Sequence, residues 1–410
     1  MKNIVIIGGG LAGLQCAKTL FENDYTDFIL LERNDKIARR NSWKTFEEPV
    51  KKFDLEDCIA NFIHEIVLRT LDIDSLKILY SNSKKINALV LDSIKVYEKL
   101  LQDIKSHVKT NREVVKIEKS KDGYEIFTKK EKYSADIIID ASGVDFCTER
   151  LLSRQEFDSI GLFTCYGKRY TNCNVERIRN LAFFDFDSPF KINGTWCYTV
   201  DENTVEIGVS RFSNSYEMNS EEIINELEKL FEKYIQLEPF NEVLKGAKLI
   251  DHVNGYCSLL PRVNIQKDNI YLLGDTKGAV PFSGYGVENA LESGRQCALS
   301  IIKKKKYKYF ITPPSRGLAG LQANWAFNAS QQRKFAGSIA EKFGKKRAYQ
   351  FFTGDMTAGF FFDCVKLANK NDIKITDYVS KGLIFRALFK LNPKRKHYES
   401  FLEKGPSARE

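Results

Sequence analysis

Three glycines and one acid near the N-terminus have residue types and a spacing that suggest chemistry. Gly8, Gly10 and Gly13 form a GxGxxG pattern, and Glu32 follows about 20 residues later. In this pattern one glycine permits a tight turn, one lets the backbone approach a pyrophosphate, and one lets a helix pack closely on a strand. An acid that ends the next strand can accept a hydrogen bond from a ribose hydroxyl. These four residues predict a dinucleotide-binding site.

A strand, a helix and a second strand must position these residues. Residues 3–7 (NIVII) form a continuous apolar run, which is typical of a strand buried on both faces of a parallel sheet. The following GGGLAGLQCAKTL predicts a helix whose free N–H groups would point at the phosphates. FILLER then predicts a second strand, which ends at Glu32. Together these segments predict a βαβ unit.

Two later segments bear on which dinucleotide binds. ADIIIDASG (135–143) predicts an apolar strand with a small-residue turn, and NIYLLGDTKGAVPFSGYG (269–286) places Asp275 between a strand and several glycines. Glycines suit a planar ring, because a Cβ would hold the backbone away from it, and a helix that begins near Gly286 can stabilise negative charge. Both segments resemble the later motifs of the glutathione-reductase-like flavoprotein superfamily. This resemblance implies FAD, rather than NAD, as the cofactor.

The same resemblance assigns parts of FAD to individual residues. It implies that Asp275 binds the ribityl chain, that residues 281–286 form a wall against the isoalloxazine ring, and that the backbone of Val114 meets the adenine. The predicted cofactor-binding residues are Gly8, Gly10, Leu11, Ala12, Gly13, Glu32, Arg33, Arg40, Val114, Gly143, Gly274, Asp275, Pro281, Gly284, Tyr285 and Gly286.

The source of electrons is predicted to lie outside the chain. No second GxGxxG follows the first, so a dedicated NADPH-binding domain is not expected. The reductant would be NAD(P)H that visits the flavin transiently, or a ferredoxin-like protein.

The segment between the cofactor motifs predicts the substrate side. GTWCYTVDENTVEIGVSRF (194–212) reads as two strands joined by a turn at residues 201–203, with Trp196, Tyr198 and Val200 alternating onto one face. A long aromatic sheet of this kind could cover a pocket above the flavin, with Trp43 as a further member. The alternative is that each of these aromatic residues belongs to an ordinary core.

Most of residues 1–300 resembles geranylgeranyl reductases. GDTKGAVPFSGYGVENALESG is similar to that family's GDxxGxxxPxxGxGxxxAxxSG pattern, and GTWCYTVDENTVEIGVS is similar to its aromatic strand pair. The family often has a Pro-Cys-Gly segment after the second strand, which IARRNSWKTFEEP lacks. The resemblance implies reduction of alkene bonds in a hydrophobic isoprenoid or lipid, with Trp43, Trp196 and Tyr198 lining the substrate pocket.

Other segments resemble lycopene cyclases. RNSWKTF is similar to their Asn-x-x-Trp-x-Phe stretch, although its spacing is one residue shorter, and LAFFDF is similar to their Met-Asp-aromatic-Arg region without the arginine. Under this alternative Asp185 or Glu206 would be the acid, and the flavin would act without net redox change. A structural role of both carboxylates remains the competing interpretation. Halogenases are a weaker match, and a flavin monooxygenase (hydroxylase) also stays open.

These segments predict an α/β fold with a Rossmann-like FAD-binding domain of hydroxybenzoate-hydroxylase-like topology. That domain is expected to be discontinuous, over residues 1–50, 85–150 and 263–305. An inserted antiparallel-sheet domain over 51–84 and 151–262 would bind the substrate, and residues 306–410 would form C-terminal helices.

Composition limits the remaining possibilities. The 410 residues carry a net charge of +9, and no apolar run approaches the roughly 20 residues of a membrane-spanning helix. The nine cysteines are scattered without a CxxC pair, and the four histidines lack zinc-site spacing, so neither disulfides nor a metal site is predicted. We expect a cytoplasmic protein that does not bind nucleic acid. The basic stretches KKKKYK and KGLIFRALFKLNPKRK are candidates for peripheral contact with a membrane, or are solvated helix ends.

Overall fold

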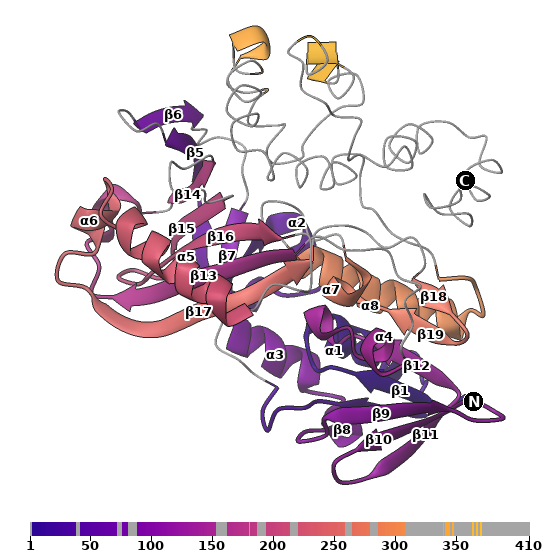
Figure 1. Cartoon of the computed structure of the whole chain (residues 1–410). Helices are drawn as coiled ribbons and strands as arrows, with labels where there is room; N and C mark the ends of the chain where they lie inside the picture. The colour runs from indigo at the N-terminus through magenta and orange to yellow at the C-terminus, as the bar shows by residue number, and fades with distance from the viewer. Residues whose placement is uncertain are drawn as a thin grey trace.

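The computed structural model describes the chain in ten main stretches. These are residues 2–37, 42–71, 76–80, 88–152, 162–179, 181–186, 194–213, 220–258, 265–278 and 286–307, with isolated residues beyond 338. Most of the predicted C-terminal helical region, 306–410, therefore lies outside the described residues. Figure 1 shows two main bodies of structure, one around β1 and one around β13.

A six-stranded sheet holds the N-terminal strand at its centre. Its order is β18-β19-β12-β1-β2-β8, and the five strands from β19 to β8 are parallel. The strands are β1 (Ile4–Ile7), β2 (Phe28–Leu31), β8 (Val108–Lys109), β12 (Ile137–Asp140), β18 (Gln266–Lys267) and β19 (Ile270–Leu272). All four residues of β1 are buried, as expected for a parallel strand covered on both faces.

Two helices that are far apart in sequence cross closely beside this sheet. They are α1 (Leu11–Phe21) and α8 (Gly286–Ile302), and α1 also contacts α3 (Ser93–Leu101). A Cβ on Gly294 would lie 2.3 Å from the carbonyl oxygen of Ala12. Small side chains at these two positions therefore permit the close crossing.

A seven-stranded sheet forms the second body. Its order is β17-β13-β16-β15-β14-β5-β6, with all neighbours antiparallel except β14 and β5. The strands are β5 (Glu65–Leu71), β6 (Leu76–Tyr80), β13 (Leu162–Thr171), β14 (Leu181–Phe186), β15 (Gly194–Thr199), β16 (Val205–Ser213) and β17 (Lys248–Ser258). Helix α5 (Ser220–Tyr234) packs on one face through Leu227 and Phe231, against Ile207 and Val209. Because side chains alternate along a strand, Glu206 and Gly208 lie on the opposite face.

Two three-stranded sheets complete the strand structure. One is β3 (Ser42–Phe46), β7 (Ala88–Asp92) and β4 (Ile59–Ile63); the other is β9 (Val114–Lys119), β10 (Tyr124–Thr128) and β11 (Lys132–Ala135). The short helices are α2 (Glu47–Lys52), α4 (Cys147–Leu151), α6 (Phe240–Val243) and α7 (Gly274–Lys277). The amide of Asn61 in β4 donates to the carbonyl oxygen of Thr199 in β15, which ties the small sheet to the large one.

The predicted fold class is confirmed, since a parallel Rossmann-like sheet is accompanied by separate antiparallel sheets. The boundaries of the predicted domains stay a prediction. Within 51–84, β4 joins the small sheet with β3 and β7, whereas β5 and β6 extend the seven-stranded sheet. Among the described residues no helix is both long and apolar enough to cross a membrane.

Candidate functional site

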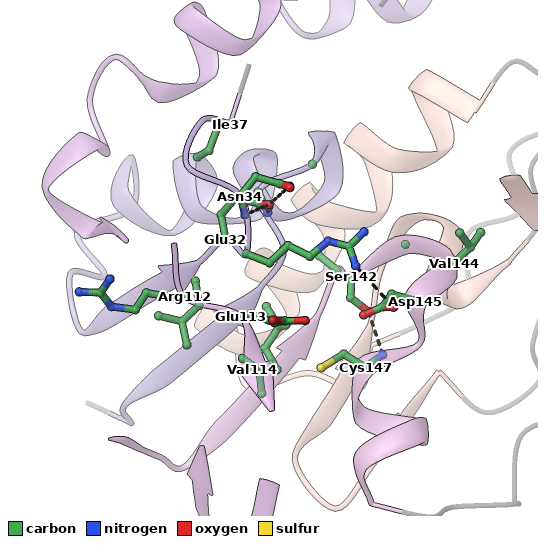
Figure 2. Close-up of a pocket in the computed structure, with 18 of the residues that line it drawn as sticks. Glu32, Asn34, Ile37, Arg112, Glu113, Val114, Ser142, Val144, Asp145 and Cys147 are labelled. Atoms are coloured by element: carbon green, nitrogen blue, oxygen red, sulfur yellow. Dashed lines mark hydrogen bonds and ion pairs between the residues drawn. The ribbon is translucent and has the colours of Figure 1, made fainter. Parts of the chain in front are cut away.

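A cavity of about 390 Å³ opens where β1, β2 and β12 end. Its size is within the range of about 300–1,000 Å³ that is usual for small-molecule sites. Open α/β folds bind ligands beyond the carboxyl ends of their parallel strands. Figure 2 shows residues from either side converging on this groove: Glu32 and Asn34 from one side, and Ser142, Asp145 and Cys147 from the other.

The three glycines of the GxGxxG pattern have different surroundings. Gly8 has φ +106°, and a Cβ there would lie 2.4 Å from the carbonyl oxygen of Ala141. A Cβ on Gly13 would lie 2.1 Å from the carbonyl oxygen of Gly8, so this glycine permits close packing of α1 on the turn. Gly10, by contrast, has no atom within 4 Å of such a Cβ. The open space in front of the first turn of α1 is therefore suited to a phosphate group.

Glu32 forms one end of the groove. It is only 8% exposed, and its carboxylate accepts hydrogen bonds from the backbone N–H groups of Gly9 at 2.8 Å and Asn34 at 2.9 Å. The side-chain amide of Asn34 donates to the same carboxylate. These contacts fix the acid beside the glycine turn. Asn34 was not predicted from the sequence.

The turn after β12 forms the opposite wall. Asp140 accepts hydrogen bonds from Ser142 Oγ and Thr148 Oγ1, both at 2.6 Å, and thereby holds the turn that carries Gly143. Arg33, a predicted cofactor residue, lies with its Nη1 3.5 Å from the carboxylate of Asp145 in this wall. The sequence did not identify Asp140, although an acid that ends a buried strand is a visible signal.

Val114, the predicted adenine contact, lines the same groove. It begins β9, is buried, and lines the groove beside Glu113 and Cys147 (Figure 2). Burial raises the pKa of the Cys147 thiol far above its ordinary value, so this cysteine contributes an uncharged wall. Val114 and Cys147 therefore offer uncharged surface that is suited to a planar base.

Asp275 lines the same groove from α7. The N–H of Gly274 donates to Ser293 Oγ at 2.9 Å, and Thr276 Oγ1 donates to the carbonyl oxygen of Gly143 at 2.9 Å. These bonds join α7 to α8 and to the turn after β12. Burial raises the pKa of Asp275 to about 7, against the opposing effect of Lys277.

Lys277 lies two residues after this acid, at the end of α7, and is almost completely buried. It is 1% exposed, and its Nζ donates to Asn289 Oδ1 at 2.8 Å, while Asn289 Nδ2 donates to the carbonyl oxygen of Gly278 at 3.2 Å. Burial lowers the pKa of the Lys277 amine to about 7, opposed by the negative charges of Glu292 and Asp275. The lysine thus links the end of α7 to the first turn of α8.

Replacing Lys277 with methionine should stabilise the flavin-free protein at neutral pH. In the unfolded chain the Lys277 amine is protonated below its ordinary pKa of 10.5. In the folded protein it is protonated only below about pH 7. Folding therefore carries a free-energy cost that is complete below pH 7 and vanishes as the pH rises to 10.5. We expect Lys277→Met to raise the free energy of unfolding by about 2 kcal/mol at pH 7, with a smaller gain at pH 10, measured by urea denaturation.

The partly exposed Lys18, which pairs with Glu22 within α1, provides the control. Lys18→Met should change the stability by less than about 0.5 kcal/mol. A Lys277→Met protein that is less stable than wild type at both pH values would contradict the prediction, because the bond to Asn289 would then outweigh the cost of burial.

Several predicted cofactor-binding residues are not among those that line the groove. Arg40, Pro281, Gly284 and Tyr285 lie outside the described residues. Leu11 and Ala12 are buried in α1, where a Cβ on Gly274 would lie 3.0 Å from Ala12 Cβ. Ala12 therefore contributes to helix packing. Gly286 is the first residue of α8, as predicted for the start of a helix.

A buried polar network occupies the face of the seven-stranded sheet opposite α5. Arg169 and Glu206 are 3% and 4% exposed, and Arg169 Nη2 lies 2.9 Å from Glu206 Oε2. The other oxygen of Glu206 accepts from the hydroxyl of Tyr198 at 2.6 Å and from the indole N–H of Trp196 at 3.2 Å. Both oxygens of the proposed cyclase acid thus already have protein donors. Asp185 belongs to β14, and its side chain is outside the description.

Trp196 lies flat across this face because two glycines leave room for it. A Cβ on Gly208 would lie 2.2 Å from its ring, and a Cβ on Gly167 would lie 2.9 Å from it. These glycines belong to β16 and β13 and are directly paired. The structure therefore brings the predicted Trp196 and Tyr198 together on one flat wall.

Trp43 lies elsewhere. Its ring packs edge-on against Tyr97, with centroids 5.1 Å apart, and Tyr97 lines the dinucleotide groove. Lys44, the next residue in β3, instead has its Nζ 5.1 Å from the centroid of the Tyr198 ring. The structure thus brings Lys44, and not Trp43, to the wall formed by Trp196 and Tyr198. Sequence reasoning missed Lys44.

Comparison with known proteins agrees with this geometry. Residues 5–149 match the family model described as pyridine nucleotide-disulphide oxidoreductase. This stretch contains the glycine turn, Glu32, Val114 and Gly143. The chain has no CxxC pair, so the match concerns the dinucleotide-binding region rather than disulphide chemistry. No curated protein sequence matches the chain.

Solved structures resemble almost the whole chain. A geranylgeranyl bacteriochlorophyll reductase-like protein from Thermoplasma acidophilum has a TM-score of 0.62 at 17% identity, covering 97% of this chain and 98% of that one. A triple mutant of the flavin-dependent brominase Bmp2 has a TM-score of 0.63 at 13% identity, covering 91% and 100%. The halogenase PltM, solved with phloroglucinol and FAD, has a TM-score of 0.59 at 14% identity, covering 97% and 96%. The chain shares the fold of these proteins. These identities are too low to transfer a substrate, so the likeness to flavoenzymes concerns the fold alone.

Proposed function

We propose that the protein is an FAD-dependent oxidoreductase that reduces alkene bonds of a hydrophobic, isoprenoid substrate. The observation that supports the proposal is a single groove lined by several of the residues expected to hold FAD. Gly10 leaves open space at the start of α1, and Glu32 and Asp275 both line this groove. When bound, FAD would supply hydride to the substrate.

The residues that line this groove would hold different parts of FAD. The first turn of α1 would hold the pyrophosphate through free N–H groups, and Glu32 would accept from the adenosine ribose. Val114 and Cys147 would flank the adenine. Asp275, whose pKa is raised to about 7 by burial, would accept a hydrogen bond from the ribityl chain. The N-terminus of α8 would stabilise negative charge on the reduced ring.

The substrate would lie against the wall of Trp196 and Tyr198. Flat aromatic surfaces bury large apolar area, which suits an isoprenoid chain. An isolated alkene is a poor hydride acceptor, so positioning and exclusion of water must provide much of the catalysis. The resemblance of GDTKGAVPFSGYGVENALESG to geranylgeranyl reductases supports this choice of substrate class.

Electrons would come from NAD(P)H or a ferredoxin-like protein, as no second GxGxxG is present.

We also propose a cytoplasmic protein with peripheral membrane contact as one way to reach a lipid. Lys303, Lys304, Lys305 and Lys306 are all exposed at the end of α8, which suits either anionic headgroups or water.

Hydroxylation is the second candidate. The fold is shared with p-nitrophenol 4-monooxygenase from Pseudomonas putida, at a TM-score of 0.55 and 13% identity. Lycopene cyclase-like chemistry is less favoured, because both oxygens of Glu206 are engaged by Arg169, Tyr198 and Trp196.

The product distinguishes the three reactions. The bound flavin is photoreduced without oxygen, geranylgeranyl diphosphate or lycopene is added, and flavin reoxidation is followed together with product mass. A gain of two hydrogen atoms for each reduced double bond supports reduction. An unchanged mass with new rings supports cyclisation, and a gain of one oxygen atom after admission of air supports hydroxylation. Protein purified without flavin that cannot be reconstituted with FAD would refute all three.

A further inference from the structure

Asn34 lines the dinucleotide groove two residues after Glu32 (Figure 2). Its backbone N–H donates to Glu32 Oε1 at 2.9 Å, and its side-chain amide donates to the same oxygen. The other oxygen of the acid, Oε2, accepts from the backbone N–H of Gly9 at 2.8 Å. The loop after β2 thus holds one oxygen of Glu32, and the glycine turn holds the other.

These donors leave a defined acceptor position on Glu32. A carboxylate offers about four acceptor positions, two on each oxygen. Among the described residues, Asn34 supplies two donors to Oε1, and Gly9 supplies one donor to Oε2. Because Glu32 lines the groove, the position that remains for a ligand hydroxyl is on Oε2.

Backbone hydrogen bonds fix the loop that carries Asn34. The N–H of Glu32 donates to the carbonyl oxygen of Lys109 at 2.9 Å, and the N–H of Arg112 donates to the carbonyl oxygen of Glu32 at 2.8 Å. The N–H of Asn111 donates to the carbonyl oxygen of Asn34 at 2.8 Å. These three bonds attach the loop to the turn that leads into β9. The amide of Asn34 therefore has a defined place relative to the acid.

Fixing the main chain does not by itself fix the carboxylate of Glu32. The last torsion of a glutamate side chain is broad, so the plane of the carboxylate can turn. Gly9 restrains only Oε2, and the backbone N–H of Asn34 gives Oε1 a single donor. The side-chain amide of Asn34 adds the second donor to Oε1. Without this amide the plane could turn, and the open position on Oε2 would turn with it.

We propose that Asn34 is a positioning residue for ribose recognition. Its amide holds the Glu32 carboxylate so that Oε2 accepts a hydrogen bond from one hydroxyl of the adenosine ribose. This role rests on the proposed FAD site and is independent of the alkene reaction. Asn34 acts through Glu32, so it should affect the affinity only for ligands that carry this hydroxyl.

The test measures ligand binding to the flavin-free full chain by calorimetry. The ligands are FAD, adenosine diphosphate (ADP), 2′-deoxy-ADP and 3′-deoxy-ADP. Asn34→Leu keeps the backbone N–H and the approximate size of the side chain but removes the amide. The matched control is Asn23→Leu, because the Asn23 amide donates to the carbonyl oxygen of Thr19 at 2.8 Å and does not line the groove.

Wild type should bind one of the two deoxy ligands at least about tenfold more weakly than ADP, because a hydrogen bond to a carboxylate is lost. In Asn34→Leu the affinity for ADP should fall about tenfold, while the affinity for that deoxy ligand should change by less than about twofold. The preference for the hydroxyl should therefore disappear. Asn23→Leu should keep the wild-type preference. A general disturbance of the fold would instead weaken both ligands by the same factor and leave the preference unchanged.

A double-mutant cycle tests whether Asn34 acts through Glu32. Glu32→Gln should itself lower the affinity for ADP, since an amide has only one acceptor oxygen. Adding Asn34→Leu to Glu32→Gln should lower the affinity further by less than about twofold, against about tenfold in the wild-type background. Equal losses in the two backgrounds would overturn the positioning role.

Thermal unfolding verifies that each variant is folded, and Asn34→Ala replaces Asn34→Leu if leucine prevents folding. If wild type binds FAD and ADP but the Asn34 variant keeps the wild-type preference for the hydroxyl, the role of Asn34 is overturned and the FAD site stands. Equal affinity of wild type for ADP and both deoxy ligands would also overturn that role. If wild type binds neither FAD nor ADP, the FAD site and the role of Asn34 fall together.

Discussion

Protein carrying Gly10→Val should fold normally and be purified without flavin. Gly10 has extended backbone angles (φ −76°, ψ 179°) that valine readily adopts, and no atom lies within 4 Å of an added Cβ. The valine methyl groups would fill the space before the first turn of α1, where the pyrophosphate is proposed to bind. We expect FAD affinity to fall at least about 100-fold, or roughly 2.7 kcal/mol. Flavin absorbance of the purified protein and an FAD titration would measure this loss.

Two glycine variants provide the comparison. Gly10→Ala intrudes less into the same space and should lose less affinity than Gly10→Val. Gly13→Ala places its Cβ 2.1 Å from the carbonyl oxygen of Gly8, so it should lower the thermal stability of the flavin-free protein, which Gly10→Val should not. Wild-type FAD affinity in Gly10→Val would show that the cofactor binds elsewhere.

Arg169→Met should strongly destabilise the folded protein. It leaves the carboxylate of Glu206, only 4% exposed, without its cation. Removing one partner of a buried ion pair typically costs about 3–5 kcal/mol, because the remaining charge is buried without compensation. The hydrogen bonds from Tyr198 and Trp196 remain and limit the loss. Urea denaturation of the flavin-free protein would measure this change in the free energy of unfolding.

The neighbouring residue in β13 provides a matched control on the opposite face. Lys168 Nζ lies 2.6 Å from Glu232 Oε1, but the Glu232 side chain is 50% exposed. Lys168→Met should therefore cost less than about 1 kcal/mol, since water can solvate the remaining carboxylate. The double variant Arg169→Met, Glu206→Leu should recover most of the stability lost in the single variant. If Arg169→Met is as stable as Lys168→Met, the ion pair between Arg169 and Glu206 contributes little to stability.

The cofactor end of the molecule was largely predictable because its determinants are local in sequence. Gly8, Gly10 and Gly13 lie within one turn and one helix, and the run of apolar residues around them identifies the buried strand. Glu32 follows on the next strand, which pairs with β1 in parallel. Asn34 was missed because its hydrogen bond to Glu32 belongs to a turn that no residue pattern predicts. Asp140 was missed although it ends a buried strand.

The substrate side was predictable only in part. Alternation along β15 correctly placed Trp196 and Tyr198 on one face, since a strand has a period of two. It could not reveal that Gly167 and Gly208 make room for the indole, because these glycines lie on two other strands whose register is set by the assembled sheet. Trp43 was grouped with these aromatic residues, but the structure places it beside Tyr97.

By itself the sequence determined the βαβ unit, the FAD-like motifs and the α/β class, because short-range periodicity and glycine spacing encode them. Only the tertiary structure decided which charged residues became buried. Arg169 meets Glu206 across paired strands, Lys277 is sealed between α7 and α8, and Lys44 reaches Tyr198. The physical reason is that burial and charge pairing depend on contacts between segments far apart in the chain. Residue type alone would have placed these three cations at the surface.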